Sequence, residues 1–468
     1  MGKFEKRREK DELIKIFEHQ LRNGSFSFYD EESFENIIDH YFDIGDYQNA
    51  LKASEIALEQ YPYSLDIILA KTDILINLDE LEEALETLRI AASFHPGDME
   101  ILTLKGNILS MQGNYREAIE CYEEVLPESQ EKDDIHYNIG LFQQNLENYE
   151  AAIYHFKAAL EFNIENEDAL YELAYCLDVT GELSNSLSYY QRFIDQDPYS
   201  PNAWYNIGIV YSKLEKYQES INAFEYATLI KNDFASAYFN MGNTYLSINS
   251  YTKALNAFRK TLEIEGASPE TYFKIGFAYE KLGQFDLGLK YYQKAAKLDI
   301  FYHEAWFRSG ECLRSEEKWY QSIHFYNKAL KIDNDNPEYW VAVAKAEYQI
   351  GNIVSSIDAW EEAVILDPTS EDIWLDWSNI YYEQGDYQKA LETILPGLNE
   401  LPDNASLMYR ATAYLLAAGN FKEAFHYLEN ALILAFEKHV VLFDFFPEIE
   451  MQKALYKIIN QFRKEDTE

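Results

Sequence analysis

Cysteine, proline and glycine are scarce in this sequence of 468 residues, with 3, 11 and 19 copies respectively. So little proline and glycine argues against a disordered chain. Cys121, Cys176 and Cys312 are far apart and odd in number, and no CxxC or Cys/His spacing occurs. A disulfide framework and a zinc site are therefore not expected. We interpret the three residues as reduced and structural, which suits a cytoplasmic protein.

Basic residues are also few, since 40 Lys and Arg stand against 81 Asp and Glu, for a net charge of -41. Such a chain repels phosphate backbones and anionic lipid head groups, so we expect no binding to nucleic acid or to a membrane surface. A basic protein or peptide would be attracted to it. The alternative is that the acidity only keeps a long, open molecule in solution.

Long apolar runs are absent, and none approaches the ~20 residues that a membrane-spanning helix needs. The first residues, MGKFEKRREKDELIKIF, are charged and contain no apolar region of a signal peptide. Gly2 suits N-myristoylation, but Lys6 stands where that motif has serine or threonine. We therefore expect no membrane insertion.

Catalytic motifs are missing as well. The nine histidines are scattered without the HExxH spacing, and the sequence has no GxxxxGKS or GxxxxGKT, no GxSxG, and no GxGxxG after a strand. Adjacent acidic pairs such as Asp133 and Asp134 are expected on solvated faces in so acidic a chain. We predict that the protein is not an enzyme and needs no metal or other cofactor.

The sequence does have a period of 34 residues. Residues 201–211, 235–245 and 269–279 read PNAWYNIGIVY, ASAYFNMGNTY and PETYFKIGFAY. The same offset continues without an insertion from residue 31 to residue 438, which gives twelve repeats. The repeats begin at Glu31, Leu65, Met99, Asp133, Glu167, Pro201, Ala235, Pro269, His303, Pro337, Glu371 and Ala405.

Each repeat predicts two amphipathic helices. Apolar residues fall at positions 4, 7, 8 and 11 of a repeat and again at positions 17, 20, 21, 24 and 27, which is the spacing of a helical stripe. Position 20 is never larger than serine, position 8 is glycine in half of the repeats, and position 17 is always large and apolar. Small residues let two helix backbones approach closely, and large residues fill the space beside them. Glycines at position 15, from Gly45 to Gly419, are expected to end the first helix.

This pattern, W-x2-LG-x2-Y followed by G-x-Y-x2-A and then F, A and P, resembles the tetratricopeptide repeat. The resemblance covers residues 31–438. It implies an all-α fold, a right-handed superhelical solenoid of antiparallel helix pairs. It also implies a concave inner surface, lined by the first helices, that binds peptides or partner proteins.

The two ends lie outside the repeats. Residues 1–30 are expected to form a flanking helix with a basic tip, in which Leu13, Ile16 and Phe17 face the first repeat. Residues 439–468 are expected to contain a capping helix, because a terminal repeat exposes an apolar face. Its predicted stripe is Ala454, Leu455, Ile458, Ile459 and Phe462. The alternative for this segment is a docking site for a partner, formed by Leu442, Phe443, Phe445 and Phe446.

In the family, positions 2, 5, 6, 9, 12 and 13 line the concave surface. Position 5 is aromatic in repeats four to nine, and this strip is Tyr137, Tyr171, Tyr205, Phe239, Phe273 and Phe307. Such rings could grip apolar side chains of a peptide, each worth ~1.5–3 kcal/mol when buried. The alternative is that they pack along the helix seam. Position 6 is asparagine at Asn138, Asn206 and Asn240, which resemble the residues by which some family members hold a peptide backbone.

Acidic residues recur at position 2 and include Asp134, Asp168, Glu270 and Glu304. They form either a rim that selects basic ligands or carboxylates that complement the helix dipole, and the two roles are compatible. Family members that bind the acidic tails of heat-shock chaperones carry lysine at position 5. No repeat here has it, so we do not expect chaperone tails as partners.

The sequence therefore predicts a cytoplasmic, non-enzymatic scaffold or adaptor. Its expected ligand is a peptide or disordered segment of a partner that is basic or carries apolar anchors. One alternative is an architectural subunit of a larger complex that uses its convex faces and C-terminal cap. A more remote alternative is a regulator of a bound enzyme or of transcription machinery.

Overall fold

A computed structural model describes residues 2–23, 27–446, 453 and 455–461. The chain forms two compact units, residues 1–232 and 233–468, which are treated separately below. Both are helical, and these described ranges contain no strand. None of their helices is both long and apolar enough to cross a membrane.

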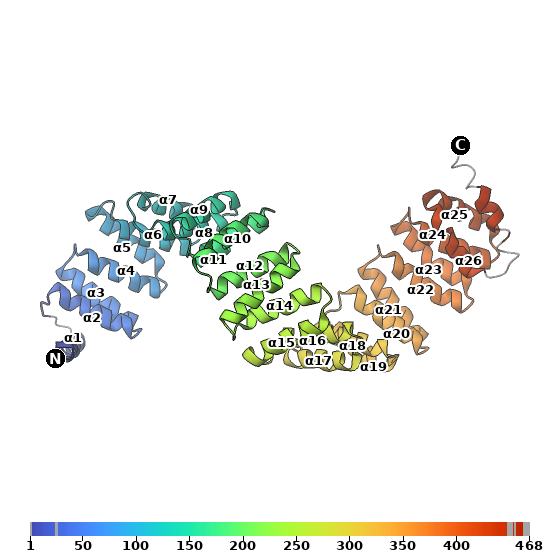
Figure 1. The fold of residues 1–468 in the computed structure, drawn as a ribbon, viewed down its shortest axis with the longest axis horizontal. Helices are drawn as coiled ribbons and strands as arrows, with labels where there is room; N and C mark the ends of the chain where they lie inside the picture. The colour runs from blue at the N-terminus through green and yellow to red at the C-terminus, as the bar shows by residue number, and fades with distance from the viewer. Residues whose placement is uncertain (1, 24–26, 447–452, 454, 462–468) are drawn as a thin grey trace. The chain divides into compact units, whose positions relative to one another are not determined.

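Among the described residues, the first unit contains thirteen α-helices and one 3-10 turn, and the second contains the remaining elements. Both units are drawn in Figure 1. Those of the first unit are α1 (Gly2–Asn23), α2 (Glu31–Asp43), α3 (Tyr47–Gln60), α4 (Leu65–Asn77), α5 (Leu81–Phe94), α6 (Met99–Met111), α7 (Tyr115–Val125), α8 (Lys132–Asn145), α9 (Tyr149–Phe162), α10 (Glu167–Val179), η1 (Leu183–Asn185), α11 (Ser186–Gln196), α12 (Pro201–Lys213) and α13 (Tyr217–Ile230). Those of the second unit are α14 (Ala235–Ser247), α15 (Tyr251–Glu265), α16 (Pro269–Lys281), α17 (Phe285–Leu298), α18 (His303–Ser315), α19 (Trp319–Leu330), α20 (Pro337–Gln349), α21 (Ile353–Leu366), α22 (Glu371–Glu383), α23 (Tyr387–Glu400), α24 (Ala405–Ala417), α25 (Phe421–Leu434), η2 (Phe436–Val441) and α26 (Leu442–Phe445).

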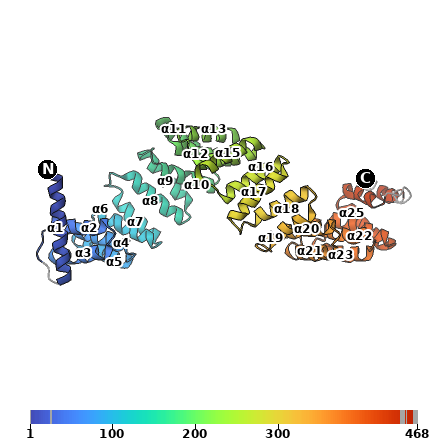
Figure 2. The ribbon, with the colours of Figure 1, turned by 90° about the horizontal axis from the view of Figure 1, so that it is seen from below.

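Every repeat is a pair of antiparallel helices, and successive pairs stack within each unit (Figures 1 and 2). The predicted all-α solenoid is confirmed. The residue before a first helix often caps it, because a side-chain oxygen accepts a backbone N–H of the first turn. Ser64 accepts from the N–H of Ile67 in this way, and Ser200 accepts from that of Ala203.

The turn inside each repeat has a left-handed residue at position 15. Glycine occupies this position in seven repeats, with φ between 71° and 80°. The other five repeats place a residue with a side chain there, and these are Asp79, Glu147, Glu215, Asn249 and Glu317. The turn geometry is therefore the same in all repeats, although only glycine adopts it without strain.

The two helices of a repeat approach closely at positions 8, 20 and 24. At position 20, Ser220 donates its hydroxyl to the carbonyl of Gly208 at position 8, at 2.8 Å. In the six repeats with glycine at position 8, an aromatic ring at position 24 lies over that glycine. In the seventh repeat a Cβ atom added to Gly242 would lie 2.6 Å from the Phe258 ring. The restrictions on side-chain size therefore come from direct contact between helices.

Tryptophans at position 4 connect successive repeats. The indole N–H of Trp204 donates to the carbonyl of Pro198 at 2.9 Å, and that of Trp374 donates to Pro368 at 2.9 Å. Trp340 makes the equivalent bond to Asn334. In each case the acceptor is position 32 of the preceding repeat. A large apolar residue thus packs at the seam while its polar group is satisfied.

The second helix of repeat five differs from the others, because it begins with the 3-10 turn η1 and continues as α11. Its first residues include Ser184, Asn185, Ser186 and Ser188. Ser186 and Ser188 donate their hydroxyls to the carbonyls of Leu183 and Asn185. Such side chains compete with the backbone for hydrogen bonds, which disfavours a regular first turn.

The segments outside the repeats pack on the first and last helix pairs. Helix α1 lies against α2 (Figure 2), and Phe17 is buried while Ile16 is exposed. Near the C-terminus Leu442 is fully buried, as are Leu455 and Ile459 in a short helical stretch. Ala454 and Phe462, also in the predicted capping stripe, lie outside the described residues. Phe443 and Phe445 pack against the chain itself, so these rings are not free for a partner.

Replacing Gly242 with valine tests the close approach of the two helices. The added atoms would overlap the Phe258 ring, and overpacking of this kind costs about 1–3 kcal/mol. We expect the free energy of local opening of α14 and α15, measured by native-state hydrogen exchange, to fall by about that amount. Ser236→Val, at an exposed site of the same helix, is the matched control. Equal losses in both variants would contradict the packing argument.

A pair of histidines joins the helices of repeat four. The Nδ1 atoms of His136 and His155 are 3.0 Å apart, and Phe162 stacks on His136 with ring centroids 5.8 Å apart. A hydrogen bond between two ring nitrogens requires that the accepting ring is neutral. Burial, with a smaller contribution from His136, lowers the pKa of His155 to about 4. Burial also lowers the pKa of His136.

We expect this pair to destabilise the chain as the pH falls from about 6.5 towards 4, because the unfolded state then binds more protons than the folded state. Urea unfolding followed by circular dichroism at about pH 7 and about pH 5 measures the effect. In a His155→Phe variant the difference between the two midpoints should be smaller. An unchanged difference would show that the pair does not contribute.

Candidate functional site

The candidate site is the face formed by positions 2, 5, 6, 9, 12 and 13 of the first helices, called the first-helix face below. In the first unit, position 5 carries Tyr137 on α8, Tyr171 on α10 and Tyr205 on α12. Tyr171 is 50% exposed, and Tyr137 and Tyr205 are half-buried. Position 3 of the next repeat is alanine after Tyr137 and Tyr171, at Ala169 and Ala203.

In the second unit the aromatic strip is less accessible. Phe239 is half-buried against Phe258, but Phe273 and Phe307 are only 6% and 3% exposed. Each is covered by a second ring from a neighbouring position. Tyr302 stacks on Phe273 with centroids 5.0 Å apart, and Tyr339 stacks on Phe307 at 4.5 Å. At these two repeats the strip serves packing, which is the alternative considered from the sequence.

The predicted asparagines and acidic residues occupy the expected helices. Asn138 donates its amide to the carbonyl of Asp134 at 2.8 Å, so part of its hydrogen-bonding capacity is used within α8. Asn206 and Asn240 are half-buried. The four acidic residues lie in the first turns of their helices, where they complement the helix dipole; they are Asp134, Asp168, Glu270 and Glu304.

Two hollows of the first unit bring some of these residues together. One, of about 940 Å³, is lined by residues of repeats three and four that include Asp134, Tyr137 and Asn138. A smaller one, of about 130 Å³, is lined by Tyr171, Asn206 and other residues of repeats five and six. Five sequence-predicted residues of the first unit therefore line these two hollows, whereas Tyr205 and Asp168 line neither.

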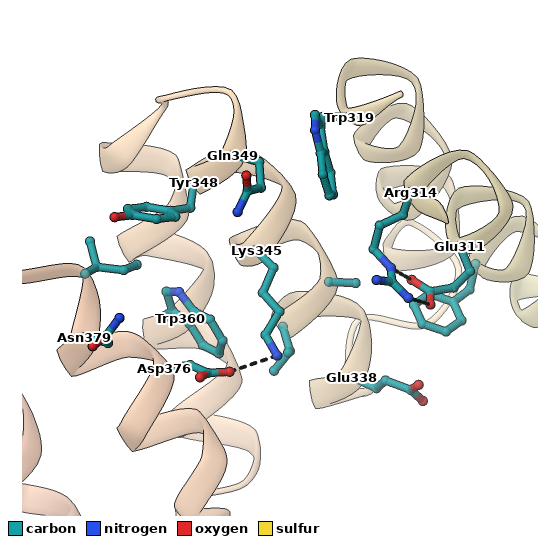
Figure 3. A pocket seen from close by; sticks show the side chains of 14 residues that line it. Glu311, Arg314, Trp319, Glu338, Lys345, Tyr348, Gln349, Trp360, Asp376 and Asn379 are labelled. Carbon is teal, nitrogen blue, oxygen red and sulfur yellow. Dashed lines mark hydrogen bonds and ion pairs between the residues drawn. The ribbon is translucent and has the colours of Figure 1, made fainter. Parts of the chain in front are cut away.

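A third pocket belongs to the second unit and has a volume of about 550 Å³. Its lining residues come from α18, α19, α20, α21 and α22 (Figure 3). Its lining consists of Phe307, Glu311, Arg314, Trp319, Glu338, Val341, Ala342, Lys345, Tyr348, Gln349, Trp360, Asp376, Asn379 and Ile380. Most of these residues occupy the positions that define the first-helix face. The volume is within the range of ordinary ligand sites.

One wall of the pocket is a fixed polar network. Glu311 accepts two hydrogen bonds from Arg314, at 3.0 and 2.8 Å, and a third from the hydroxyl of Tyr326 at 2.6 Å. Tyr326 is fully buried, and burial together with Glu311 raises its pKa. The hydrogen bond to Glu311 also raises the pKa of Arg314. A bidentate pair of this kind holds both side chains in one orientation.

The opposite wall contains Tyr348, Trp360 and Asp376, with Lys345 between the two walls (Figure 3). Lys345 pairs with Asp376 at 2.8 Å. Tyr348 donates to Glu383, and this bond, followed by burial, raises its pKa to about 12. Glu338 at the rim has no ion pair among the described residues. The pocket therefore has one carboxylate without a direct ion pair, although the charge of Arg308 acts on it from a greater distance.

Trp360 is 2% exposed, and its buried indole N–H has no acceptor among the described residues. It occupies position 24, where Tyr292 and Tyr326 of earlier repeats donate to Glu280 and Glu311. A buried donor without a partner costs about 1–3 kcal/mol. The nitrogen itself has almost no exposed surface, so Trp360 lacks the hydrogen bond that the tyrosines make at this position.

The cysteines are unsuited to nucleophilic chemistry. All three are buried and unpaired with each other. Burial raises the pKa of Cys176 and of Cys312 to about 12, and it also raises that of Cys121. Their thiols therefore stay protonated near neutral pH, and only the thiolate is a good nucleophile.

Comparison with known families agrees with the repeat pattern. Models of the tetratricopeptide repeat match residues 41–108, 103–167, 242–283, 269–300 and 303–336. The chain is a tetratricopeptide repeat protein. Residues 145–227 also match the family described as anaphase-promoting complex, cyclosome, subunit 3.

Similar proteins of known name cover small parts of this repeat protein. The photosystem I assembly protein Ycf3 of Prochlorococcus marinus (strain MIT 9215) is 30% identical over 97 residues, which is 20% of this chain and 56% of that protein. The Ycf3 protein of P. marinus subsp. pastoris is 28% identical over 97 residues, with the same coverage. The chain thus spans about half the length of the curated relatives it matches.

Among solved structures, YrrB, described as a TPR protein with an unusual peptide-binding site, is 20% identical and covers 39% of this chain and 94% of its own, with a TM-score of 0.35. MamA is 27% identical and covers 36% of this chain and 92% of its own, with a TM-score of 0.33. A chain from the structure of the APC/C hetero-tetramer Cut9-Hcn1 is 15% identical. The match covers 84% of this chain and 89% of that chain, with a TM-score of 0.36.

The sequence did not single out the residues at the centre of the pocket, among them Lys345, Trp360 and Asp376. A usable signal lies in repeat ten. Its positions 5 and 6 are Val341 and Ala342, whereas repeats four to nine carry an aromatic residue and a longer polar residue there. The loss of side-chain volume at these two adjacent positions opens the pocket.

The network at Glu311 leads to a prediction. Glu311→Ala removes the acceptor of the buried Tyr326 hydroxyl, and an unsatisfied buried hydroxyl costs about 1–3 kcal/mol. In a Tyr326→Phe background the same change should cost less, because no hydroxyl then needs an acceptor. Hydrogen exchange of α18 and α19 in the four proteins of this cycle measures both costs. Equal costs in the two backgrounds would show that the bond to Tyr326 contributes nothing.

Proposed function

We propose that this tetratricopeptide repeat protein is a non-enzymatic, cytoplasmic scaffold that binds an extended segment of a partner protein along its first-helix face. The observation that carries the proposal is that three hollows and the exposed ring of Tyr171 lie on this face. Tyr171 is half exposed, and the pocket of repeats nine to eleven combines apolar walls with fixed charges. Such a combination can bury an apolar anchor and orient the polar groups around it.

The chemistry of the partner follows from the charge of the chain. A net charge of -41 favours basic segments by long-range attraction. Position 2 adds carboxylates at the edge of the face, among them the exposed Asp134, Asp168 and Glu270. Acidic segments, including acidic chaperone tails, would be repelled. A partner segment with basic residues and apolar anchors fits both properties.

A second candidate function is an architectural subunit that binds through the second helices. It is favoured by exposed apolar side chains there, such as Tyr320 on α19 and Val354 on α21, which are 75% and 70% exposed. The C-terminal apolar side chains do not support this function, because Leu442, Phe443 and Phe445 pack against the chain itself. The two candidates use different faces, so surface substitutions distinguish them.

Tyr171→Ala and Tyr320→Ala form a matched pair for this test, since both remove an exposed tyrosine, from the first-helix face and from a second helix respectively. The wild-type chain and both variants are used for affinity capture from lysate of cells that produce the protein, with quantitative mass spectrometry. We expect Tyr171→Ala to reduce recovery of the partner about tenfold or more, and Tyr320→Ala to leave it unchanged. The opposite result would favour the architectural function.

A further inference from the structure

The pocket of repeats nine to eleven has an occupied counterpart one repeat further along the chain. There the ring of Phe445 lies beside Tyr382, with centroids 5.0 Å apart, and the guanidinium of Arg410 lies 4.7 Å from its centroid. Tyr414 completes the surroundings at 6.4 Å. The hydroxyl of Tyr382 donates to the carbonyl of Phe445 at 3.4 Å. A segment outside the repeats thus places an aromatic residue on the first-helix face.

The residues around Phe445 have equivalents 34 positions earlier. Tyr382 is position 12 of repeat eleven, and Arg410 and Tyr414 are positions 6 and 10 of repeat twelve. The corresponding residues one repeat earlier are Tyr348, Asp376 and Ile380, and all three line the pocket. The positions that surround Phe445 therefore recur one repeat earlier, around the pocket. Among the described residues, no side chain from outside the repeats fills the pocket as Phe445 fills its own place.

Two further properties of the pocket bear on the entry of an aromatic side chain. Val341 and Ala342 leave space where earlier repeats carry long side chains, and Trp319 lines the pocket with a half-buried ring, while Phe307 and Trp360 contribute only a small exposed area. The buried N–H of Trp360 lacks an acceptor among the described residues. Because that nitrogen has almost no exposed surface, an acceptor reaches it only if the side chains around it move.

The charge beside the ring is reversed between the two places. Arg410 lies against Phe445, whereas its equivalent in the pocket is Asp376. Asp376 forms an ion pair with Lys345, and Glu338 at the rim has no ion pair in the described ranges. A residue that flanks the bound ring would therefore face net negative charge, which favours lysine or arginine.

We propose that this pocket binds an aromatic side chain flanked by a basic residue, in an extended segment of a partner protein. The inference rests on the proposed function, because it identifies the part of the first-helix face that takes the anchor. It commits to a partner with an aromatic–basic motif. A second copy of the chain's own C-terminal segment is disfavoured, since acidic Asp444 precedes Phe445.

Dye-labelled peptides test the proposal with the full-length chain. The probe has a central phenylalanine flanked by lysines in a glycine–serine background, and binding is followed by fluorescence anisotropy. Replacing its phenylalanine with alanine, or its lysines with glutamate, should weaken binding about tenfold or more. Equal affinity for the phenylalanine and alanine peptides would overturn the proposal.

Variants of the protein locate the binding. Ala342→Asn introduces the residue that repeats four, six and seven carry at this position, so it should fold normally while it fills the pocket. We expect it to weaken the phenylalanine–lysine peptide about tenfold or more. Val341→Phe, which restores the ring of the earlier repeats, should have the same effect. Asp358→Asn, at an exposed position of α21 in the same repeat, is the matched control and should bind as wild type, with unchanged circular dichroism in all three variants.

The outcomes separate this inference from the proposed function. If Ala342→Asn leaves peptide binding intact, the pocket is not the anchor site, even when Tyr171→Ala still abolishes partner capture. If partner capture is insensitive to Tyr171→Ala and the peptide binds nowhere on the chain, both proposals fail. Reduced discrimination between lysine and glutamate peptides in Glu338→Gln would support the assignment of charge, and unchanged discrimination would contradict it.

Discussion

The structure depends on the close approach of two helices within each repeat. Position 20 is small enough for a serine hydroxyl there, as in Ser220, to reach the backbone carbonyl of position 8. The ring at position 24 then covers position 8, and an added Cβ at Gly242 would overlap that ring. Because close packing tolerates little change in volume, these three positions fix how the helices of each pair meet. Stacking of identical pairs then follows from the constant length of the repeat.

The same contact connects the core to the candidate site. A ring at position 24 starts on the second helix, and its far end reaches the first-helix face. Tyr292 and Tyr326 donate there to Glu280 and Glu311, which orients carboxylates on the surface. In repeat ten the ring is Trp360, whose N–H has no such acceptor among the residues described. Tryptophan in place of tyrosine at this core position thus leaves the first-helix face of repeat ten without that hydrogen bond.

Most of the fold could be predicted from the sequence, because side-chain size and capping residues recur at fixed positions and act locally. The candidate site was less predictable. Phe273 and Phe307 share position 5 with Tyr171, yet they are buried, because Tyr302 and Tyr339 of neighbouring positions cover them. The pocket depends on absent volume at Val341 and Ala342, and a search for conspicuous residues does not detect an absence. Tyr302 belongs to the same repeat as Phe273, and Tyr339 belongs to the repeat after that of Phe307, so side chains at other positions decide which rings are accessible.

The position of Phe445 also limits how a ligand can lie on the second unit. Its ring packs against Tyr382 and Arg410, and its carbonyl accepts a hydrogen bond from Tyr382. Tyr382 follows shortly after Ile380, the last residue that lines the pocket. A peptide that lay along this surface would be blocked by Phe445. The tail would therefore set a terminus for the bound sequence, so that the distance from that terminus to the anchoring ring becomes a criterion of recognition alongside composition.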